Sequence, residues 1–480
     1  MLKKQNIVGR KAEQEVLNSC VMSSKSEFIA VYGRRRIGKT YLIKQYFKEQ
    51  FDFYMTGSLN MSKSEHLAYF NSQINKYSKS CYPLVKTWFD AFKQLEHYLS
   101  TLKNKKKIII FIDELPWFDK KNTKFLSNFE LFWNSFASEL NNLKLIVCGS
   151  STTWMVTKFL GNKGGLHNRV TRKINLKPFT LKETEDFLKY LKIDWDRLQI
   201  LQCYMTFGGV PYYLSLLKRE FSLIQNIDYL FFSENSELKN EYTLLYSSLF
   251  NDSKIYHRII ELLATKLQGL SRKEIVEKLK ITDNGTLSEA FENLVNCDFI
   301  RSYSPFKKNK RDSLFQLTDL FSLFYLKFVK NYNGKNQHFF AELKDEKKSN
   351  WYGYSFEQVC LLHTNQIKQS LGISGVASDI CSWSYTSKQD ENLQEKGTQI
   401  DLIIDRDDRI INICEIKYSE SKYEISSSLN EKLLYRKTLF KSKTKTSKTI
   451  HLTMITTKGL TNSKYCGNIN SSIILDDLFC

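Results

Sequence analysis

Eight residues, Gly33–Thr40, have the spacing in this sequence that is most specific for chemistry. They fit the pattern G-x-x-x-x-G-K-[ST], in which backbone N–H groups between two glycines close around phosphate oxygens. Lys39 is expected to reach the β- and γ-phosphates of a nucleoside triphosphate, and the Thr40 hydroxyl is expected to bind Mg²⁺. The predicted phosphate-binding residues are Gly33, Arg34, Arg35, Arg36, Ile37, Gly38, Lys39 and Thr40.

Two acidic residues, Asp113 and Glu114, follow an apolar run, residues 108–112, downstream of this loop. In phosphoryl transfer, one acid at a strand end holds Mg²⁺ and another group orients the attacking water. We therefore expect Asp113 to hold Mg²⁺ through water and Glu114 to act as the general base. Together with the loop, this pair predicts hydrolysis of a nucleoside triphosphate.

One match to the guanine-reading pattern N-K-x-D occurs in the sequence, at Asn309–Asp312. It follows Lys307 and Lys308 instead of an apolar strand, and it lies far beyond the phosphate loop. Residues Asp113–Pro116 also lack the D-x-x-G pattern of a GTPase switch. Because both guanine signatures are missing from their expected places, adenine is favoured, and the predicted cofactors are ATP and Mg²⁺.

Apolar runs and helical patterns predict the elements that would position these groups. Residues 28–32 predict a buried strand before the loop, and residues 41–47 predict a helix whose N-terminal end faces the phosphates. Residues 108–112 and 143–148 predict two further strands of the same sheet. The sequence therefore predicts a P-loop core with a parallel sheet over residues 1–178.

A second candidate site lies in the last third of the sequence. Asp401 belongs to one predicted strand, Glu415 and Lys417 belong to the next, and Glu357 lies in a helix upstream. Residues two apart on a strand share a face, so Glu415 and Lys417 should lie together while Ile416 turns into the core. This order resembles the PD-(D/E)xK nuclease core, in which the three carboxylates would bind Mg²⁺ and Lys417 would position or deprotonate a water. The alternative is a β-hairpin with ordinary amphipathic charges.

Residues 251–330 resemble a winged helix-turn-helix. Their pattern predicts three helices and then a β-hairpin with a basic tip, Lys307–Arg311. The third helix, which would enter the major groove of DNA, carries Glu289 and Glu292 and no Lys or Arg. Contact with the phosphate backbone through the tip, or a purely structural role, is therefore favoured over reading of the base sequence.

The sequence is similar to the archaeal-type ATPases, a branch of the AAA and signal-transduction ATPase group that also occurs in bacteria. The resemblance implies an AAA-like core, a helical lid, and a nuclease-like domain of unknown function at the end of the chain. The motifs that carry it occur in the family's order at Ile7–Arg10, Gly33–Thr40, Asp113–Glu114, Cys148–Ser151, Asn168–Arg169 and Gly208–Tyr213.

The same resemblance implies roles for further residues. Val8, Gly9 and Arg10 would lie near the adenine, and Gly208–Pro211 would open the lid over the nucleotide. Ser150 or Ser151 would sense the γ-phosphate, the alternative being an ordinary turn. Arg169 would stabilise charge on the transferred phosphoryl group, unless it is a solvated surface arginine.

Composition limits the class of protein further. A net charge of +20 and a pI near 9.3 favour a nucleic acid partner bound mainly through its phosphate backbone, although an AT-rich genome would also enrich lysine. No apolar run approaches the ~20 residues that span a bilayer, and the N-terminus has no secretory h-region. The ten cysteines include no C-x-x-C pair. We expect a cytoplasmic protein with no membrane partner.

The predicted fold class is a multidomain α/β protein, and two functions are compatible with it. The expected domains are a P-loop ATPase core (residues 1–178), a helical lid (179–250), a winged helix-turn-helix (251–330) and a C-terminal α/β restriction-endonuclease-like domain (345–480). In the first hypothesis, the ATP state controls Mg²⁺-dependent cleavage of nucleic acid. In the second, the ATP state controls assembly, such as formation of a homo-oligomer, and the terminal domain only binds a partner.

Overall fold

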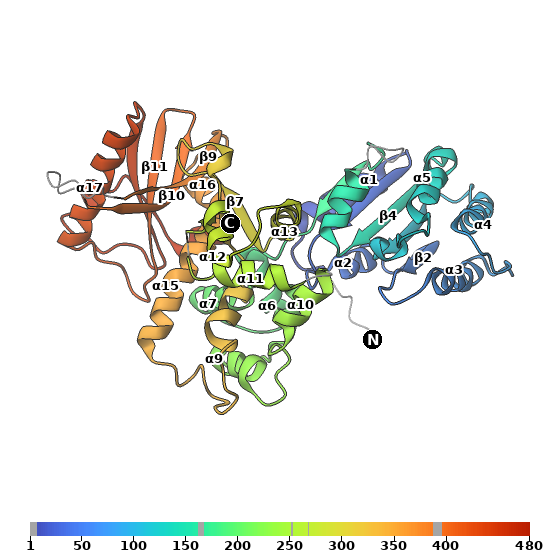
Figure 1. Ribbon diagram of the computed structural model, residues 1–480, viewed down its shortest axis with the longest axis horizontal. Coiled ribbons are helices and arrows are strands. Elements are labelled where there is room, and N and C mark those ends of the chain that lie inside the picture. Colours follow the sequence, from blue (N-terminus) through green and yellow to red (C-terminus); the bar gives the residue numbers. More distant parts are fainter. Residues whose placement is uncertain (1–6, 162–167, 251–252, 267, 387–395) are drawn as a thin grey trace. The chain divides into compact units, whose positions relative to one another are not determined.

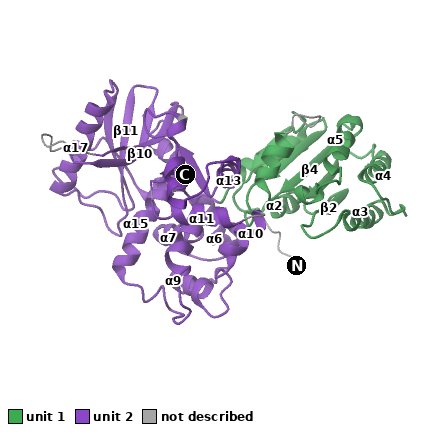
Figure 2. Ribbon diagram, in the orientation of Figure 1, with its two compact units in different colours: residues 1–178 green, residues 179–480 purple. Residues whose placement is uncertain are grey.

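The computed structural model describes residues 7–161, 168–250, 253–266, 268–386 and 396–480. The chain divides into two compact units, Met1–Pro178 and Phe179–Cys480 (Figure 2). Across these described ranges, no helix combines the length and the apolar character needed to cross a membrane.

A five-stranded sheet forms the centre of the first unit (Figure 1). Its strand order is β2-β3-β4-β1-β5, and every neighbouring pair is parallel, as predicted. Because the strands run in one direction, their carboxyl ends meet at one edge of the sheet, where ligands bind in open α/β folds. The strands are β1 (Glu27–Tyr32), β2 (Phe53–Thr56), β3 (Ile108–Asp113), β4 (Leu143–Gly149) and β5 (Arg172–Asn175).

Helices cover both faces of this sheet. Successive strand residues point to opposite faces, so Ala30 and Ile110 pack in one hydrophobic cluster, and Ile29 and Phe111 pack in the other. The first cluster holds α3 (Lys63–Ser78), α4 (Trp88–Thr101) and α5 (Phe125–Ser135). The second cluster holds α1 (Lys11–Met22) and α2 (Lys39–Tyr46), the helix that follows the phosphate loop.

The second unit begins with helices and continues into a three-helix segment with a small sheet. In the small sheet, β6 and β7 each pair antiparallel with β8. The helices of the first part are α6 (Leu181–Tyr190), α7 (Arg197–Phe207), α8 (Pro211–Ser215), α9 (Leu223–Ile227) and α10 (Glu241–Leu249). The following elements are α11 (Ser253–Leu263), β6 (Leu270–Ser271), α12 (Arg272–Leu279), α13 (Gly285–Asn296), β7 (Ile300–Tyr303), β8 (Leu314–Leu317) and α14 (Leu320–Phe324).

A second five-stranded sheet lies near the C-terminus, with the order β13-β12-β11-β10-β9. The strands β9, β10 and β11 pair antiparallel, and β12 and β13 then add in parallel. Cys414 packs with α15 on one face, whereas Ile413 packs with α17 on the other. The elements are α15 (Asp345–Leu362), α16 (Thr364–Ser370), β9 (Ser378–Tyr385), β10 (Thr398–Arg406), β11 (Ile410–Lys417), α17 (Ser427–Thr444), β12 (Thr449–Thr456) and β13 (Ser471–Ile473).

One hydrophobic cluster joins the three parts of the second unit. It contains Leu201 of α7, Ile259 of α11, Phe356 of α15 and Cys414 of β11. The hairpin made of β7 and β8 also contacts the C-terminal sheet, because the Phe306 N–H donates to Ser382 O at 2.8 Å. Since this packing is continuous, the domain boundaries predicted inside residues 179–480 stay a prediction.

Candidate functional site

The phosphate loop connects β1 to α2 at the carboxyl edge of the parallel sheet. Gly33 has a φ of 141°, and a Cβ at this position would lie 2.3 Å from Leu176 O, so a larger residue would push the loop away from β5. Gly38, with a φ of 86°, precedes α2 in the left-handed region that glycine adopts most easily. The two glycines therefore shape the loop as the sequence pattern predicts.

Lys39, the first residue of α2, is buried within this loop. Its Nζ donates to Gly33 O and to Arg34 O, each at 2.9 Å. These contacts fold the ammonium group back onto carbonyls of its own loop, where a phosphate oxygen could replace either acceptor. Arg34 is also buried, whereas Arg35 and Arg36 are exposed.

Thr40 and Asp113 form the polar contact between the loop and β3. The Thr40 hydroxyl donates to Asp113 Oδ2 at 2.8 Å, and the Glu114 N–H donates to Asp113 Oδ1 at 3.0 Å. Burial raises the pKa of Asp113 to about 6, and the Thr40 hydrogen bond opposes this rise. A buried carboxylate beside a hydroxyl supplies hard oxygen ligands, and a bound cation would offset its desolvation, so the pair fits Mg²⁺.

Glu114 follows β3 in a left-handed conformation with a φ of 49°. Its Oε2 accepts hydrogen bonds from the Ser150 hydroxyl at 2.7 Å and from the Ser150 N–H at 3.2 Å. Ser150 is buried directly after β4, the neighbour of β3 in the sheet. The residue predicted as general base and one of the two predicted γ-phosphate sensors are thus in direct contact.

Arg10, which was predicted with Val8 and Gly9 to lie near the adenine, contacts the phosphate loop. This buried arginine donates from Nη2 to Ile37 O in the phosphate loop at 3.2 Å, and from Nη1 to Lys177 O at 2.7 Å. Gly9, predicted to lie near the adenine, accepts a hydrogen bond from Gln14 Nε2 through its carbonyl oxygen at 2.8 Å. The role predicted for Gly9 and Arg10 at the adenine stays a prediction.

Among the residues of the first unit that the structure describes, no interaction brings the remaining predicted nucleotide contacts to the loop. Arg169 lies on an exposed turn before β5, and Ser151 is partly exposed. Pro211 begins α8 in the second unit, where Gly209 O accepts from the Phe179 N–H at 2.7 Å. The roles of Arg169 and Pro211 at the nucleotide stay predictions.

The C-terminal cluster centres on Glu415, which is 8% exposed. Its Oε1 pairs with Lys417 Nζ at 2.9 Å, and its Oε2 pairs with Arg436 Nη1 of α17. Ile416, between the two β11 residues, is buried in the core on the opposite face. The prediction that Glu415 and Lys417 share a face is confirmed.

Two further carboxyl groups, Glu357 and Asp401, belong to the same electrostatic cluster. Burial and, to a smaller extent, the charge of Asp401 raise the pKa of Glu357 to about 7. Burial also raises the pKa of Asp401, which accepts a hydrogen bond from the Gln399 amide. Within the ranges that the structure describes, however, no three His, Cys, Asp or Glu side chains converge closely enough to hold a metal ion. The donor set seen here does not form a metal site, and the metal roles predicted for Glu357, Asp401 and Glu415 stay predictions.

The sequence analysis did not predict Arg436 as part of this cluster, because the residue belongs to α17 and lies outside the nuclease-like motif. Its Nε also donates to Thr398 Oγ1 at 3.1 Å, so it links α17 to β10 as well as to β11. Leu429, Leu433 and Phe440 form the buried stripe of α17, and Arg436 lies in that stripe at helical spacing. A lone arginine among apolar positions was the available signal, since a buried charge requires a partner.

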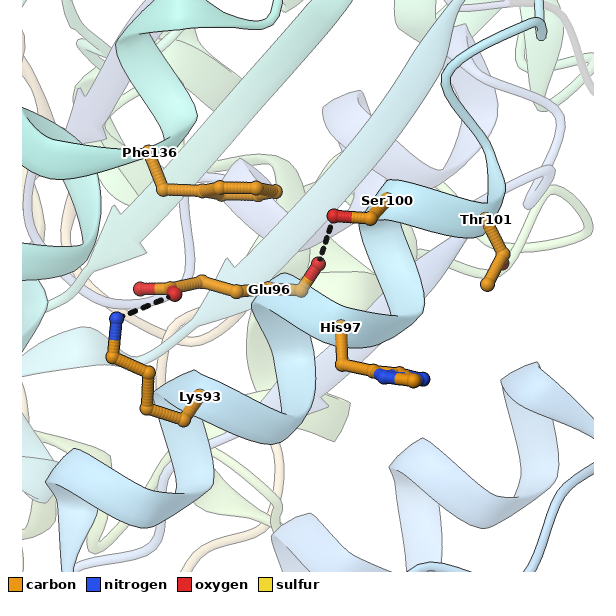
Figure 3. A pocket seen from close by; sticks show the side chains of 6 residues that line it. All are labelled: Lys93, Glu96, His97, Ser100, Thr101 and Phe136. Atoms are coloured by element: carbon orange, nitrogen blue, oxygen red, sulfur yellow. Dashed lines mark hydrogen bonds and ion pairs between the residues drawn. The ribbon is translucent and has the colours of Figure 1, made fainter.

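A surface hollow of about 510 Å³ opens beside α4 in the first unit (Figure 3). Lys93 Nζ and Glu96 Oε2 lie 2.7 Å apart across one side of it. None of its lining residues belongs to the phosphate loop or the acidic pair, so the hollow is separate from the candidate site. The lining residues are Lys93, Glu96, His97, Ser100, Thr101 and Phe136.

The parallel sheet, the phosphate loop and the acidic pair at the strand ends define the first unit as a P-loop ATPase fold. Residues 7–217 match the family model described as an ATPase domain predominantly from Archaea. Over these residues the chain is similar to the archaeal-type ATPases.

Comparison with other proteins extends over most of the chain. An uncharacterized protein of Methanocaldococcus jannaschii is 27% identical over 449 residues, which cover 91% of this chain and 92% of the relative. A solved Walker-type ATPase of Pyrococcus abyssi is 17% identical, with a TM-score of 0.48, and covers 67% of this chain and 96% of its own. The ORC2 protein of Aeropyrum pernix, solved in ADPNP and ADP complexes, is 13% identical, with a TM-score of 0.41, and covers 67% of this chain and 93% of its own.

Proposed function

We propose that the first unit binds and hydrolyses ATP with Mg²⁺. The observation that carries this proposal is the chain of hydrogen bonds from Thr40 through Asp113 to Glu114 and on to Ser150. It joins the loop, β3 and β4 at one edge of the sheet, where groups that bind phosphate, hold a cation and activate water are all needed. Mg²⁺ would offset charge on the phosphates when bound at Thr40 and Asp113.

Each residue then has a distinct task. Lys39 exchanges its two carbonyl acceptors for β- and γ-phosphate oxygens. Glu114 accepts a proton from the attacking water, which requires that its carboxylate turn from Ser150 toward the γ-phosphate. Ser150 holds Glu114 in place before that turn, so it is a positioning residue in this proposal.

We further propose that the ATP state controls the C-terminal cluster. Support comes from hydrogen bonds at either end of a short connection: Arg10 binds Ile37 O and Lys177 O, and the Leu181 N–H donates to His363 Nε2 at 3.0 Å. His363 Nδ1 lies 2.8 Å from Val359 O of α15, the helix that also carries Glu357. Burial lowers the pKa of His363 to about 4, so the ring stays neutral and can accept the Leu181 bond.

The C-terminal domain is proposed to be nuclease-like and to act on nucleic acid. Its support is the pairing of Glu415 with Lys417 and the raised pKa values of Glu357 and Asp401. A raised carboxyl pKa reflects unfavourable ionisation, which a cation or a positively charged partner relieves. Lys417 would orient the water that attacks the phosphodiester.

The second candidate function is a signalling or assembly switch whose terminal domain binds a partner without cleavage. Arg436 and Lys417 already neutralise Glu415. In the hairpin tip, Lys307 Nζ donates to Thr444 O of α17 at 3.0 Å. Both contacts would suit a domain held in place for binding.

An assay of two activities on one preparation distinguishes these functions. ATP turnover is measured with and without DNA and RNA, and cleavage is measured with Mg²⁺ and ATP, for the wild type and Lys417→Ala. Turnover stimulated by nucleic acid and cleavage lost in Lys417→Ala support the first function. Turnover together with equal inertness of both proteins toward every substrate contradicts the cleavage role and supports the switch.

A further inference from the structure

Arg301 lies on the face of the β7–β8 hairpin that turns away from the three-helix segment. Its register partner is Gln316, while the alternate residues Ile300 and Leu317 are buried in the core against the helices. Phe315 confirms this orientation, because its ring stacks on Phe291 of α13 with centroids 4.1 Å apart. Arg301 and Gln316 therefore belong to the opposite face of the hairpin.

The guanidinium of Arg301 is a desolvated cation without a carboxylate partner in the described part of the chain. Its Nε donates to Gln316 Oε1 at 2.6 Å, and its Cζ lies 4.5 Å from the centre of the Tyr303 ring. Burial lowers the pKa of Arg301, whereas Tyr303 raises it. A desolvated charge without an opposite charge is unfavourable, and an anion would relieve it.

Tyr303 places this arginine beside the C-terminal cluster. The Ser382 hydroxyl of β9 donates to the Tyr303 hydroxyl at 3.3 Å, and the Tyr303 hydroxyl donates to Gln268 O at 2.5 Å. Burial raises the pKa of Tyr303, and the charges of Arg301 and Asp401 then act on it in opposite directions. Tyr303 is thus close to both the Arg301 cation and a carboxylate of the cluster, that of Asp401.

We propose that Arg301 binds a phosphate group, supplied by the backbone of a nucleic acid that enters the C-terminal cluster. This inference rests on the proposed nucleic-acid function and assigns to the hairpin a substrate contact that differs from its basic tip. The planar guanidinium suits phosphate because two of its N–H groups can donate in parallel to two oxygens. Stacking on Tyr303 and the Gln316 bond fix the plane of the group before the phosphate arrives.

The first test measures the melting temperature in the Lys39→Ala background, so that phosphate at the nucleotide loop contributes less. Arg301→Gln is compared with Arg219→Gln, a control at an exposed arginine of the same unit, in chloride and in inorganic phosphate at equal ionic strength. Phosphate is expected to raise the melting temperature of the parent and control by roughly 1–3 °C and to leave Arg301→Gln unchanged. In chloride, Arg301→Gln should melt no lower than the parent, because it loses a charge that has no acidic partner among the described residues.

A lower melting temperature of Arg301→Gln in chloride with an undiminished response to phosphate would overturn the proposal and make Arg301 structural. Arg301→Lys gives a second check, because it keeps the charge and loses the planar fork. This variant should retain only part of the response to phosphate.

The second test measures fluorescence anisotropy of labelled DNA and RNA oligonucleotides in EDTA, where no cleavage can occur. Arg301→Gln is expected to weaken binding by roughly tenfold relative to Arg219→Gln. If both variants bind the oligonucleotides and do so equally tightly, the proposal is overturned, whatever the cleavage assay shows. If phosphate stabilises the protein through Arg301 but no oligonucleotide binds, the anion site stands with a free phosphate or nucleotide as its ligand, and the nucleic-acid function fails.

Discussion

The two candidate sites of this protein are built in different ways. At the nucleotide loop, backbone groups contribute much of the site, since Lys39 is held by two carbonyls and the left-handed glycines shape the loop. At the C-terminal cluster, side chains from α15, β10, β11 and α17 must meet, and Glu415 is held between two cations. The first arrangement depends on a short continuous segment, whereas the second depends on the packing of a whole domain.

This difference predicts how each site fails. A substitution in the loop should remove ligand binding and leave the fold intact, because the lost group faces the ligand. A substitution in the C-terminal cluster should weaken the fold, because it leaves a buried charge without its partner.

Lys39→Ala should abolish ATP binding and turnover, the largest effect expected here. The variant loses the cation that contacts two phosphates, and melting should stay close to that of the wild type. ATP binding followed by calorimetry, together with thermal unfolding, checks both parts. Lys48→Ala, at an exposed lysine just after α2, is the matched control and should bind ATP normally. Tight ATP binding by Lys39→Ala would contradict the role of the loop.

Arg436→Met should lower the free energy of unfolding by about 3 kcal/mol, because Glu415 would stay buried with only Lys417 as partner. The double variant Arg436→Met, Glu415→Gln should recover part of that loss, since it removes the uncompensated charge. Urea unfolding measures both values.

Lys437→Met is the control for this pair, as it alters the neighbouring, partly exposed residue of α17 and should have little effect. If Arg436→Met unfolds like the wild type, the ion pair does not stabilise the domain. The contrast with the nucleotide loop would then disappear.

The sequence predicted the first site more completely than the second, because the first lies on short continuous segments and the second depends on the packing of a whole domain. Gly33–Thr40 and Asp113–Glu114 are continuous patterns, and the strands that carry them lie where the apolar runs placed them. Arg436 and the contact of Arg10 with the phosphate loop escaped prediction. Each depends on a distant segment, which supplies Glu415 in the first case and Ile37 in the second.

The packing of the β7–β8 hairpin against β9 could not be predicted from the sequence either. Phe306 enters the core of the C-terminal sheet beside Phe440, although its local sequence reads as the flank of an exposed tip. Such a contact joins residues far apart in the chain, and no periodicity within either segment reports it.

A change of pH near neutrality should alter the affinity for Mg²⁺-ATP less than these substitutions alter ATP binding or stability. The pKa of Asp113 is raised from 3.8 to about 6. Ionisation of this carboxyl therefore lowers the stability of the fold as pH rises from about 4 to 6. Its protonation weakens Mg²⁺ binding as pH falls through the same range. The affinity for Mg²⁺-ATP should therefore fall by up to about tenfold per pH unit below 6. Titrations of ATP at several pH values, with and without Mg²⁺, measure this. Asp113→Asn should lose the Mg²⁺ dependence, and a wild-type affinity that is independent of pH below 6 would contradict the assignment.

The central claim is that Glu114 is the base of a working ATP site. Its most direct test compares Glu114→Gln with the wild type, measuring ATP affinity and single-turnover hydrolysis on the same samples. The account predicts retained ATP binding and hydrolysis slowed by roughly 10²–10⁴-fold, the range expected when a general base is removed. Hydrolysis at the wild-type rate by Glu114→Gln would contradict it.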